Sequence, residues 1–424
     1  MSNNFSKEEV VAFEDLSQGF EDATVMARNV NVYRTDQTMM ARTNDIIWRP
    51  QPYIMQSFDG MDQTANFQDQ TQLAVPATIS YSKSSPWIMD AKELRDALQE
   101  NRLGEAAKQK LSSDVNVAML TVAGLQGSLV IKRTTAAAGF DDVAQCDTIM
   151  NSQGIPPYER RLVLCSRDYN AMANNLSTAS RSFGNQKSDR AYERGYVGEV
   201  NGFETYKLDY ARRLQAAAGG GGLTISTLDA AVNYYIPVAT QTAATGETSN
   251  VDNRFQTVTL SDTTSVVAGD AFTIADVYAV HHITKENTGD LKTFRVVSVT
   301  DGTHMVITPP IISNQVSNPA SAAYQNCVVT AKSGTAAIVF LNTVATQINV
   351  FWQRDSLEIL PGRYAVPTDA GVAVMRASTS TGIEIVMQKW YDINTMKTKF
   401  RLDTLFGVVN KNTEMNGIML FSQS

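Results

Sequence analysis

Near the start of the chain, apolar and polar positions alternate with the period of a helix. Val10, Phe13, Leu16 and Phe20 recur at steps of three and four residues, with acidic residues between them. This pattern predicts an amphipathic helical arm over residues 7 to about 33. Such an apolar stripe has to be buried, either in the same subunit or against another one.

The next stretch, residues 44 to about 86, has no helical period. It contains Pro50, Pro52, Pro76 and Pro86 and is rich in Gln, Asp and Thr. Because proline interrupts helices and central strands, the sequence predicts an extended excursion or a long hairpin here, not a compact domain.

A long helical pattern follows this excursion. Asp90-Ala-Lys-Glu93 resembles a capping box, with an acidic N-cap and a Glu at the third helical position. We expect a helix from Asp90 to about Gly124, on the order of 50 Å long at 1.5 Å per residue. A helix of this length would be an architectural spine. Its apolar positions are Leu94, Leu98, Leu103, Ala107, Leu111, Val115, Met119, Val122 and Leu125.

Residues 140 to 215 mix short helical and strand patterns, and Arg161–Cys165 predicts a buried strand. The run Ala216–Gly222 has no side chain larger than a methyl group, which favours a flexible boundary. A phosphate-binding glycine loop would need a preceding strand and a following Lys-Ser/Thr, and the sequence has neither. The composition then becomes β-rich to about Val344.

Within this β-rich module, Asp301-Gly302 lies between two runs of β-branched residues. Asp-Gly tolerates the positive φ angles of a two-residue type I′ turn, so we expect a tight hairpin. The implied register pairs Val299 with His304, Val297 with Val306 and Val296 with Ile307. One face would then carry Phe294, Val296, Met305 and Ile307.

After the module, the chain returns to mixed α/β character. Ile383, Ile385 and Met387 alternate along an expected strand, and Leu402 to Leu420 predicts a last pair of short strands. The β-rich module has its own boundary, and the mixed α/β segments before and after it are expected to form one domain together. This indicates that the module is an insertion.

Bulk properties narrow the functional classes. The 424 residues allow two or three domains, and 43% hydrophobic with 19% charged residues is typical of a folded protein. The net charge of −7 argues against a dedicated nucleic-acid binder. Three separated cysteines predict neither a disulfide framework nor a zinc knuckle. We find no secretory signal pattern or apolar run of membrane-spanning length, so we expect a soluble protein.

Candidate reaction chemistry is sparse. His281 and His282 would point to opposite faces of a strand and could not bind one metal together there. The hydrolase elbow, the zinc-protease motif and the dinucleotide fingerprint do not occur in the sequence. We therefore predict no catalytic residues, no cofactor-binding residues, no metal site and no enzymatic activity.

Several segments resemble the coat proteins of podoviruses, the short-tailed Salmonella phages and their relatives. They run in matching order along the chain: Asn44-Asp-Ile-Ile-Trp-Arg-Pro50, Glu93-Leu-Arg-Asp96, Gly127-Ser-Leu-Val-Ile131, Val251-Asp-Asn-Arg-Phe255, Val299-Thr-Asp-Gly-Thr-His304, Asn349-Val-Phe-Trp352 and Gly407-Val-Val-Asn410. The resemblance implies an α+β fold of the Hong Kong 97 capsid type with an inserted six-stranded, β-barrel-like I-domain.

The same resemblance implies a domain order. We expect an N-terminal arm (1–43), an extended E-loop region (44–86), a P-domain with the spine helix (87–135), a first A-domain part (136–222), the I-domain (223–344) and a return to the A- and P-domains (345–424).

The implied function is that of a major capsid protein. It would assemble as pentamers and hexamers into an icosahedral shell, through a procapsid that a scaffolding protein templates and that expands on DNA packaging. A portal protein and enclosed double-stranded DNA, not bound by sequence, would be further partners in a virion assembled in the host cytoplasm. The alternative is a ring-forming β-rich tail or adhesion protein.

The resemblance also assigns candidate contact residues. Glu14 and Asp15 fall where the family has an acidic pair implicated in scaffold binding. In the loop Gln241–Asn250, the family carries aspartates that form salt bridges between capsomers. Here Ala243 and Thr245 stand in their place, and Glu247 is the one charged residue, so this contact is expected to be weaker or different.

Overall fold

The computed structural model describes residues 5–33, 45–64, 66–67, 69–90, 97–180, 194, 197–208, 212–218, 222–225, 234–313, 318–330, 335–366 and 371–424. The chain divides into two compact units, each built from separate stretches. Unit 1 comprises Met1–Ile47, Pro76–Leu120 and Leu357–Val409, and unit 2 comprises Trp48–Val75, Thr121–Ser356 and Asn410–Ser424.

Unit 1 contains a sheet in which six strands pair within the described residues, in the order β1-β21-β24-β23-β22, with β4 also on β24. The strands are β1 (Asn31–Val32), β4 (Tyr81–Asp90), β21 (Leu357–Pro361), β22 (Ala373–Ser378), β23 (Glu384–Asp392) and β24 (Lys397–Asn410). Ile385 and Met387 lie in β23, as predicted, whereas Ile383 just precedes it; Val386 is buried as well, so burial does not alternate there.

The predicted last pair of strands exists and its second member, Asn416–Leu420, is short, but its first member is not, because β24 is 14 residues long. Its first half alternates exposed Lys397, Lys399 and Arg401 with buried residues, so the sequence shows no apolar run there. Along this half, β24 pairs with both β4 and β23.

Helix α1 (Lys7–Ala23) confirms the predicted amphipathic arm. Ser6 caps it: its Oγ accepts from the Glu9 amide, and the Glu9 carboxylate accepts from the Ser6 amide. Phe13, Leu16 and Phe20 are buried. The helix ends earlier than predicted, at Ala23, and a short α2 (Val25–Arg28) follows.

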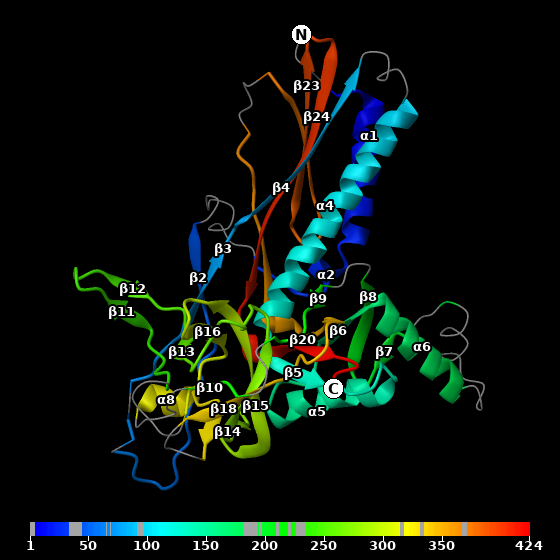
Figure 1. Cartoon of the computed structure of the whole chain (residues 1–424). Coiled ribbons are helices and arrows are strands. Elements are labelled where there is room, and N and C mark those ends of the chain that lie inside the picture. Colours follow the sequence, from blue (N-terminus) through cyan, green and yellow to red (C-terminus); the bar gives the residue numbers. More distant parts are fainter. Residues whose placement is uncertain are drawn as a thin grey trace. The chain divides into compact units, whose positions relative to one another are not determined.

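Helix α4 (Ala97–Gln126) is the predicted spine, and its 30 residues span about 45 Å. Ala107, Leu111, Val115 and Met119 are buried on one face, as expected. Within unit 1, α1 lies beside α4 (Figure 1), and Asn116 of α4 donates to the Ala23 carbonyl at the end of α1. The predicted capping box lies outside the described residues, because 91–96 are not among them.

The predicted excursion has little regular structure. β2 (Ile46–Pro50) pairs with β3 (Ala74–Thr78), and the described residues between them form neither helix nor strand. This agrees with the expectation that the stretch is no compact domain.

Unit 2 contains a mixed sheet whose described strands follow the order β5-β25-β20-β6-β8-β7. They are β5 (Leu129–Lys132), β6 (Arg160–Cys165), β7 (Glu199–Val200), β8 (Phe203–Leu208), β20 (Asn349–Gln353) and β25 (Asn416–Leu420). Helices α5 (Phe140–Ser152) and α6 (Ser166–Ser180) contribute Met150 and Met172 to its core, with Phe203 and Phe351 from the strands. The predicted buried strand at Arg161–Cys165 is confirmed as part of β6.

Unit 2 also contains short elements outside this sheet. Strand β9 (Arg213–Leu214) pairs with β19 (Thr346–Gln347), and η3 (Arg354–Ser356) and η4 (Thr413–Met415) are single turns.

The β-rich module of unit 2 is a second sheet. Its described strands follow the path β10-β18-β14-β15-β16-β13, and β17 pairs with β14 as a seventh strand, where six strands were predicted. A bridge between Ile225 and Leu260 joins the two ends of the path, which makes the sheet barrel-like. The strands are β10 (Thr224–Ile225), β13 (Gln256–Thr259), β14 (Ala271–Val280), β15 (Asn287–Val299), β16 (His304–Thr308), β17 (Cys327–Val329) and β18 (Ala336–Phe340); α8 (Pro319–Tyr324) is a short helix between β16 and β17.

The predicted hairpin exists, but its turn and part of its register differ. Val296 pairs with Ile307 as predicted, whereas a bulge at Val297 places Ser298 opposite Val306 and Val299 opposite Met305. Neither residue of Asp301-Gly302 has the positive φ that a type I′ turn needs. The predicted core face is confirmed, since Phe294, Val296, Met305 and Ile307 are all buried.

Candidate assembly surfaces

The first candidate surface is the outer face of α1. Glu14 and Asp15 are both exposed, on the side of the helix away from buried Phe13 and Leu16. Neither acid forms an ion pair with a described residue. The Lys389–Glu9 ion pair helps hold the helix on the sheet of unit 1. The acidic pair is therefore presented on a fixed helix and is open to a partner.

The second candidate surface is the hairpin of β11 (Thr240–Thr242) and β12 (Thr248–Asn250). Ala243, Thr245 and Glu247 lie in its turn, where the Ala243 amide donates to the Glu247 carbonyl over 2.8 Å. Gly246 takes a φ of 89°, which glycine adopts without strain. Every residue from 240 to 250 is exposed. A two-stranded hairpin that buries none of its side chains is marginal alone, which indicates a contact surface.

The turn at Asp301 is held by its own polar contacts. The Asp301 carboxylate accepts from the Thr303 and His304 amides, both at 2.8 Å, and lies 2.9 Å from His304 Nδ1. These bonds lower the pKa of Asp301 to about 2, the Thr303 amide contributing most. All of these contacts join residues 301 to 304, so the role of the Asp301 carboxylate is to stabilise the turn.

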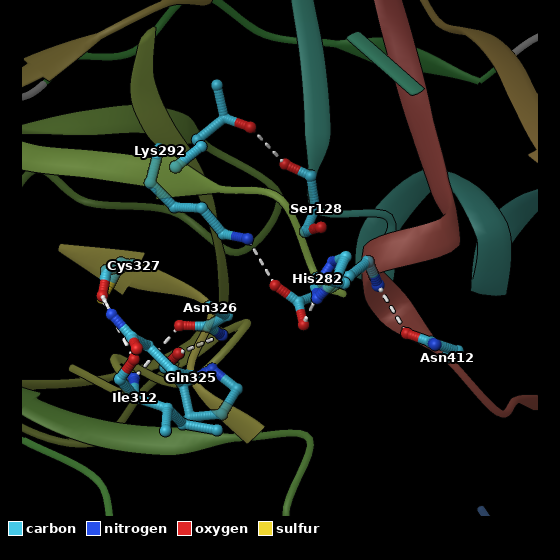
Figure 2. Close-up of polar contacts among 12 residues, drawn as sticks. Ser128, His282, Lys292, Ile312, Gln325, Asn326, Cys327 and Asn412 are labelled. Carbon is cyan, nitrogen blue, oxygen red and sulfur yellow. Dashed lines mark hydrogen bonds and ion pairs between the residues drawn. The ribbon is translucent and has the colours of Figure 1, made fainter. Parts of the chain in front are cut away.

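Unit 2 contains a largely buried charge cluster that was not predicted from the sequence (Figure 2). Lys292 Nζ on β15 forms an ion pair with Glu414 Oε1 on η4, and His282 Nε2 lies 3.9 Å from Glu414 Oε2. The Lys292 side chain is 1% exposed. Burial raises the pKa of Glu414, but Lys292 and His282 outweigh it, so that the net pKa is lowered. The residues around Lys292 are of mixed polarity and do not mark it as buried, and its partner is 122 residues away.

His282 gives this cluster a pH dependence. Burial lowers its pKa from 6.5 to about 4; Glu414 opposes this, whereas Lys292 and Lys285 add to it. The unfolded chain therefore binds the proton first, so stability is complete above about pH 6.5 and falls as the pH drops towards 4. We expect His282→Gln to remove about 2 kcal/mol of this loss. Urea unfolding at pH 7 and pH 4.5 measures it, and equal pH slopes for both proteins would refute it.

A cavity of about 390 Å³ adjoins this cluster in unit 2. His282, Glu414 and Arg254 line it together with prolines and aliphatic side chains. Arg254 is already bound: it makes two bonds to the Asp252 carboxylate and donates from Nη1 to the Asn410 carbonyl at 2.7 Å. Arg254 and Glu414 are thus engaged in contacts within unit 2.

Other chemistry is limited in the part of the chain that the structure describes. There, no three His, Cys, Asp or Glu residues gather as metal ligands, and no helix is long and apolar enough to cross a membrane. Contrary to expectation, His281 and His282 lie in the turn after β14, not in a strand. Cys146, Cys165 and Cys327 are buried and unpaired.

A family model decides the identity of the chain. The model described as "P22 coat protein - gene protein 5" matches residues 1–422. The chain belongs to the P22 coat protein family. This confirms the resemblance found in the sequence and the predicted fold class, an α+β capsid fold with an inserted I-domain.

Solved phage structures are also similar to this P22-type coat protein. The CUS-3 coat protein I-domain is 37% identical, covering 30% of this chain and 99% of its own, with a TM-score of 0.22. A structure from Mycobacterium phage Che8 is 8% identical over 95% of this chain and 92% of its own, with a TM-score of 0.46. The capsid of Cyanophage P-SCSP1u is 11% identical over 95% and 89%, with a TM-score of 0.44.

As a P22-type coat protein, the chain is a major capsid protein, many copies of which form the phage shell. Its role is structural, in the virion capsid. Family membership thus decides against the alternative of a ring-forming tail or adhesion protein. The contact residues Glu14, Asp15, Ala243, Thr245 and Glu247 stay predictions.

Proposed function

We propose that this coat protein builds its shell through a procapsid that a scaffolding protein templates. Pentamers and hexamers form the lattice, a portal protein occupies one site, and the shell expands as double-stranded DNA enters. Assembly takes place in the host cytoplasm. The net charge of −7 is compatible with enclosed DNA that is repelled by the protein, slides during packaging and is not bound in a sequence-specific way.

The observation that carries the scaffold step is the exposed acidic pair on α1. Glu14 and Asp15 project from a helix whose other face is buried through Phe13, Leu16 and Phe20. A rigid helix with two adjacent carboxylates suits a basic segment of a partner, since opposite charges steer association. We propose that this segment belongs to the scaffolding protein.

The remaining segments fit a division of labour along the chain. We propose that the arm (1–43), the E-loop region (44–86) and the P-domain (87–135) make contacts within and between capsomers. Residues 136–222 and 345–424 would form the A-domain and complete the P-domain, and 223–344 would form the I-domain. The β11–β12 hairpin would reach a neighbouring capsomer by polar contacts or through Glu247 with a different partner, because Ala243 and Thr245 cannot form ion pairs.

Reversing the charge on α1 tests the scaffold step. We expect Glu14→Lys/Asp15→Lys to weaken scaffold binding about tenfold, roughly 1.4 kcal/mol, because both carboxylates become repulsive. Scaffold content per particle, measured by gel densitometry after co-expression, should fall accordingly.

The matched control is Glu286→Lys/Asp290→Lys, which makes the same charge change at two exposed acids of the β-rich module. It should leave scaffold content unchanged. Parental scaffold content in the α1 variant, or an equal loss in both variants, would reject a scaffold site on α1.

A further inference from the structure

Three buried polar side chains of strand β15 donate hydrogen bonds or form an ion pair with residues outside the β-rich module. Lys292, Thr293 and Arg295 are 1%, 8% and 0% exposed, although each has a polar side chain. Thr293 Oγ1 donates to the Ser128 carbonyl at 2.7 Å, and Arg295 Nη1 donates to the Gly127 carbonyl at 3.4 Å. Lys292 pairs with Glu414, and a dashed line from the Lys292 Nζ marks this ion pair in Figure 2. The module thus supplies the donors, and the rest of unit 2 supplies the acceptors.

Two of these acceptors lie at the end of the spine helix. Gly127 and Ser128 directly follow α4, which ends at Gln126 and has no basic residue in its last turn. The C-terminal end of a helix carries a partial negative charge and carbonyls without helical partners. Arg295 brings a buried positive charge to this point. Its Nε and Nη2 also hold the Gly269 carbonyl in the module, at 3.2 and 2.8 Å.

The acceptor segment is itself fixed on both sides. The Gly127 amide donates to the Ala123 carbonyl of α4, and the Ser128 amide donates to the Thr413 carbonyl, each at 3.0 Å. Ser128 then leads into β5 of the mixed sheet. A module bonded to these two residues therefore takes its position from the helix end and from the sheet together.

We propose that Lys292, Thr293 and Arg295 are positioning residues of shell assembly. They hold the β-rich module at the C-terminal end of α4, and Arg295 supplies there the positive charge that the last turn of this helix does not contain. Phe294 and Val296, between and beside these donors, belong to the apolar core of the module, whereas Thr293 and Lys292 bond outside it. The apolar side chains thus form the core of the module, and the three polar residues connect that core to the rest of unit 2.

Thr293→Val tests this in the full-length subunit, since it removes the donor and keeps the shape. The matched control is Thr273→Val on β14, which is directly paired with Thr293 and is also 8% exposed. We expect the Gly127 and Ser128 amides to exchange with deuterium about fivefold faster in Thr293→Val than in the control. The Val296 amide, which is bonded to Asp270 inside the module, should be unaffected.

A second pair of variants links the contact to assembly. Arg295→Met should broaden the diameters of particles recovered after expression of the full chain, as seen by electron microscopy, and Arg295→Lys should restore a single diameter. Equal exchange in both threonine variants would overturn the proposal. So would an equal loss of protection at Val296, since the residues would then serve folding alone. Particles of parental diameter from Arg295→Met would also overturn it.

Discussion

Replacing Gly417 with alanine should abolish the recovery of shells. A Cβ at this position would lie 2.2 Å from the Leu129 carbonyl oxygen and 2.4 Å from the Leu129 Cβ. Gly417 sits on β25 between two pairing strands, opposite Leu129 of β5 and Phe351 of β20. Neither backbone can retreat without breaking the sheet of unit 2, so we expect a loss of at least about 3 kcal/mol.

The control for this substitution is Gly302→Ala. A Cβ at Gly302 meets no atom within 4 Å, and its φ is not positive. We expect a change within about 0.5 kcal/mol and a normal particle yield. Particle yield and the urea midpoint measure both variants. If both variants had similar yields and midpoints, β25 would accommodate a Cβ at position 417, and the predicted clash with Leu129 would be wrong. A large loss of stability in Gly302→Ala would instead indicate that Gly302 has a positive φ, as in the type I′ turn predicted from the sequence.

The elements that the sequence predicts well are those whose pattern is local. The stripes of α1 and α4 repeat at helical spacing over several turns, so the helices and their buried faces follow from sequence alone. The resemblance to coat proteins identified the family from fragments spread along the whole chain. The exposed position of Glu14 and Asp15 also follows from the stripe, because they fall between its apolar residues.

The features that could not be predicted from the sequence depend on contacts between residues far apart in the chain. A bulge at Val297 shifts half of a hairpin, and nothing in a run of β-branched residues reveals which one bulges. The N-terminal half of β24 is sandwiched between β4 and β23, so its charged residues alternate without an apolar run. The Lys292–Glu414 pair joins positions 122 residues apart, and only the folded chain brings them together.

That pair should carry the second large effect. We expect Lys292→Met to cost about 3 kcal/mol, because it leaves the Glu414 carboxylate, only 16% exposed, without the cation that it pairs with. His282 cannot replace the lysine at neutral pH, since burial lowers its pKa to about 4. Equilibrium urea unfolding at pH 7, analysed with a common slope, gives the loss.

Two further variants separate the cost of an unpaired charge from the worth of the pair. Lys292→Met/Glu414→Leu removes both charges and should recover most of the loss, because apolar replacements of a buried pair are close to neutral. Lys110→Met breaks an exposed pair with Asp114 and should cost less than about 1 kcal/mol. If the double variant were as unstable as the single one, desolvation would not be the cause. The attraction between Lys292 and Glu414 would then itself hold η4 against the β-rich module, and pairing at this site would outweigh the cost of burying the charges.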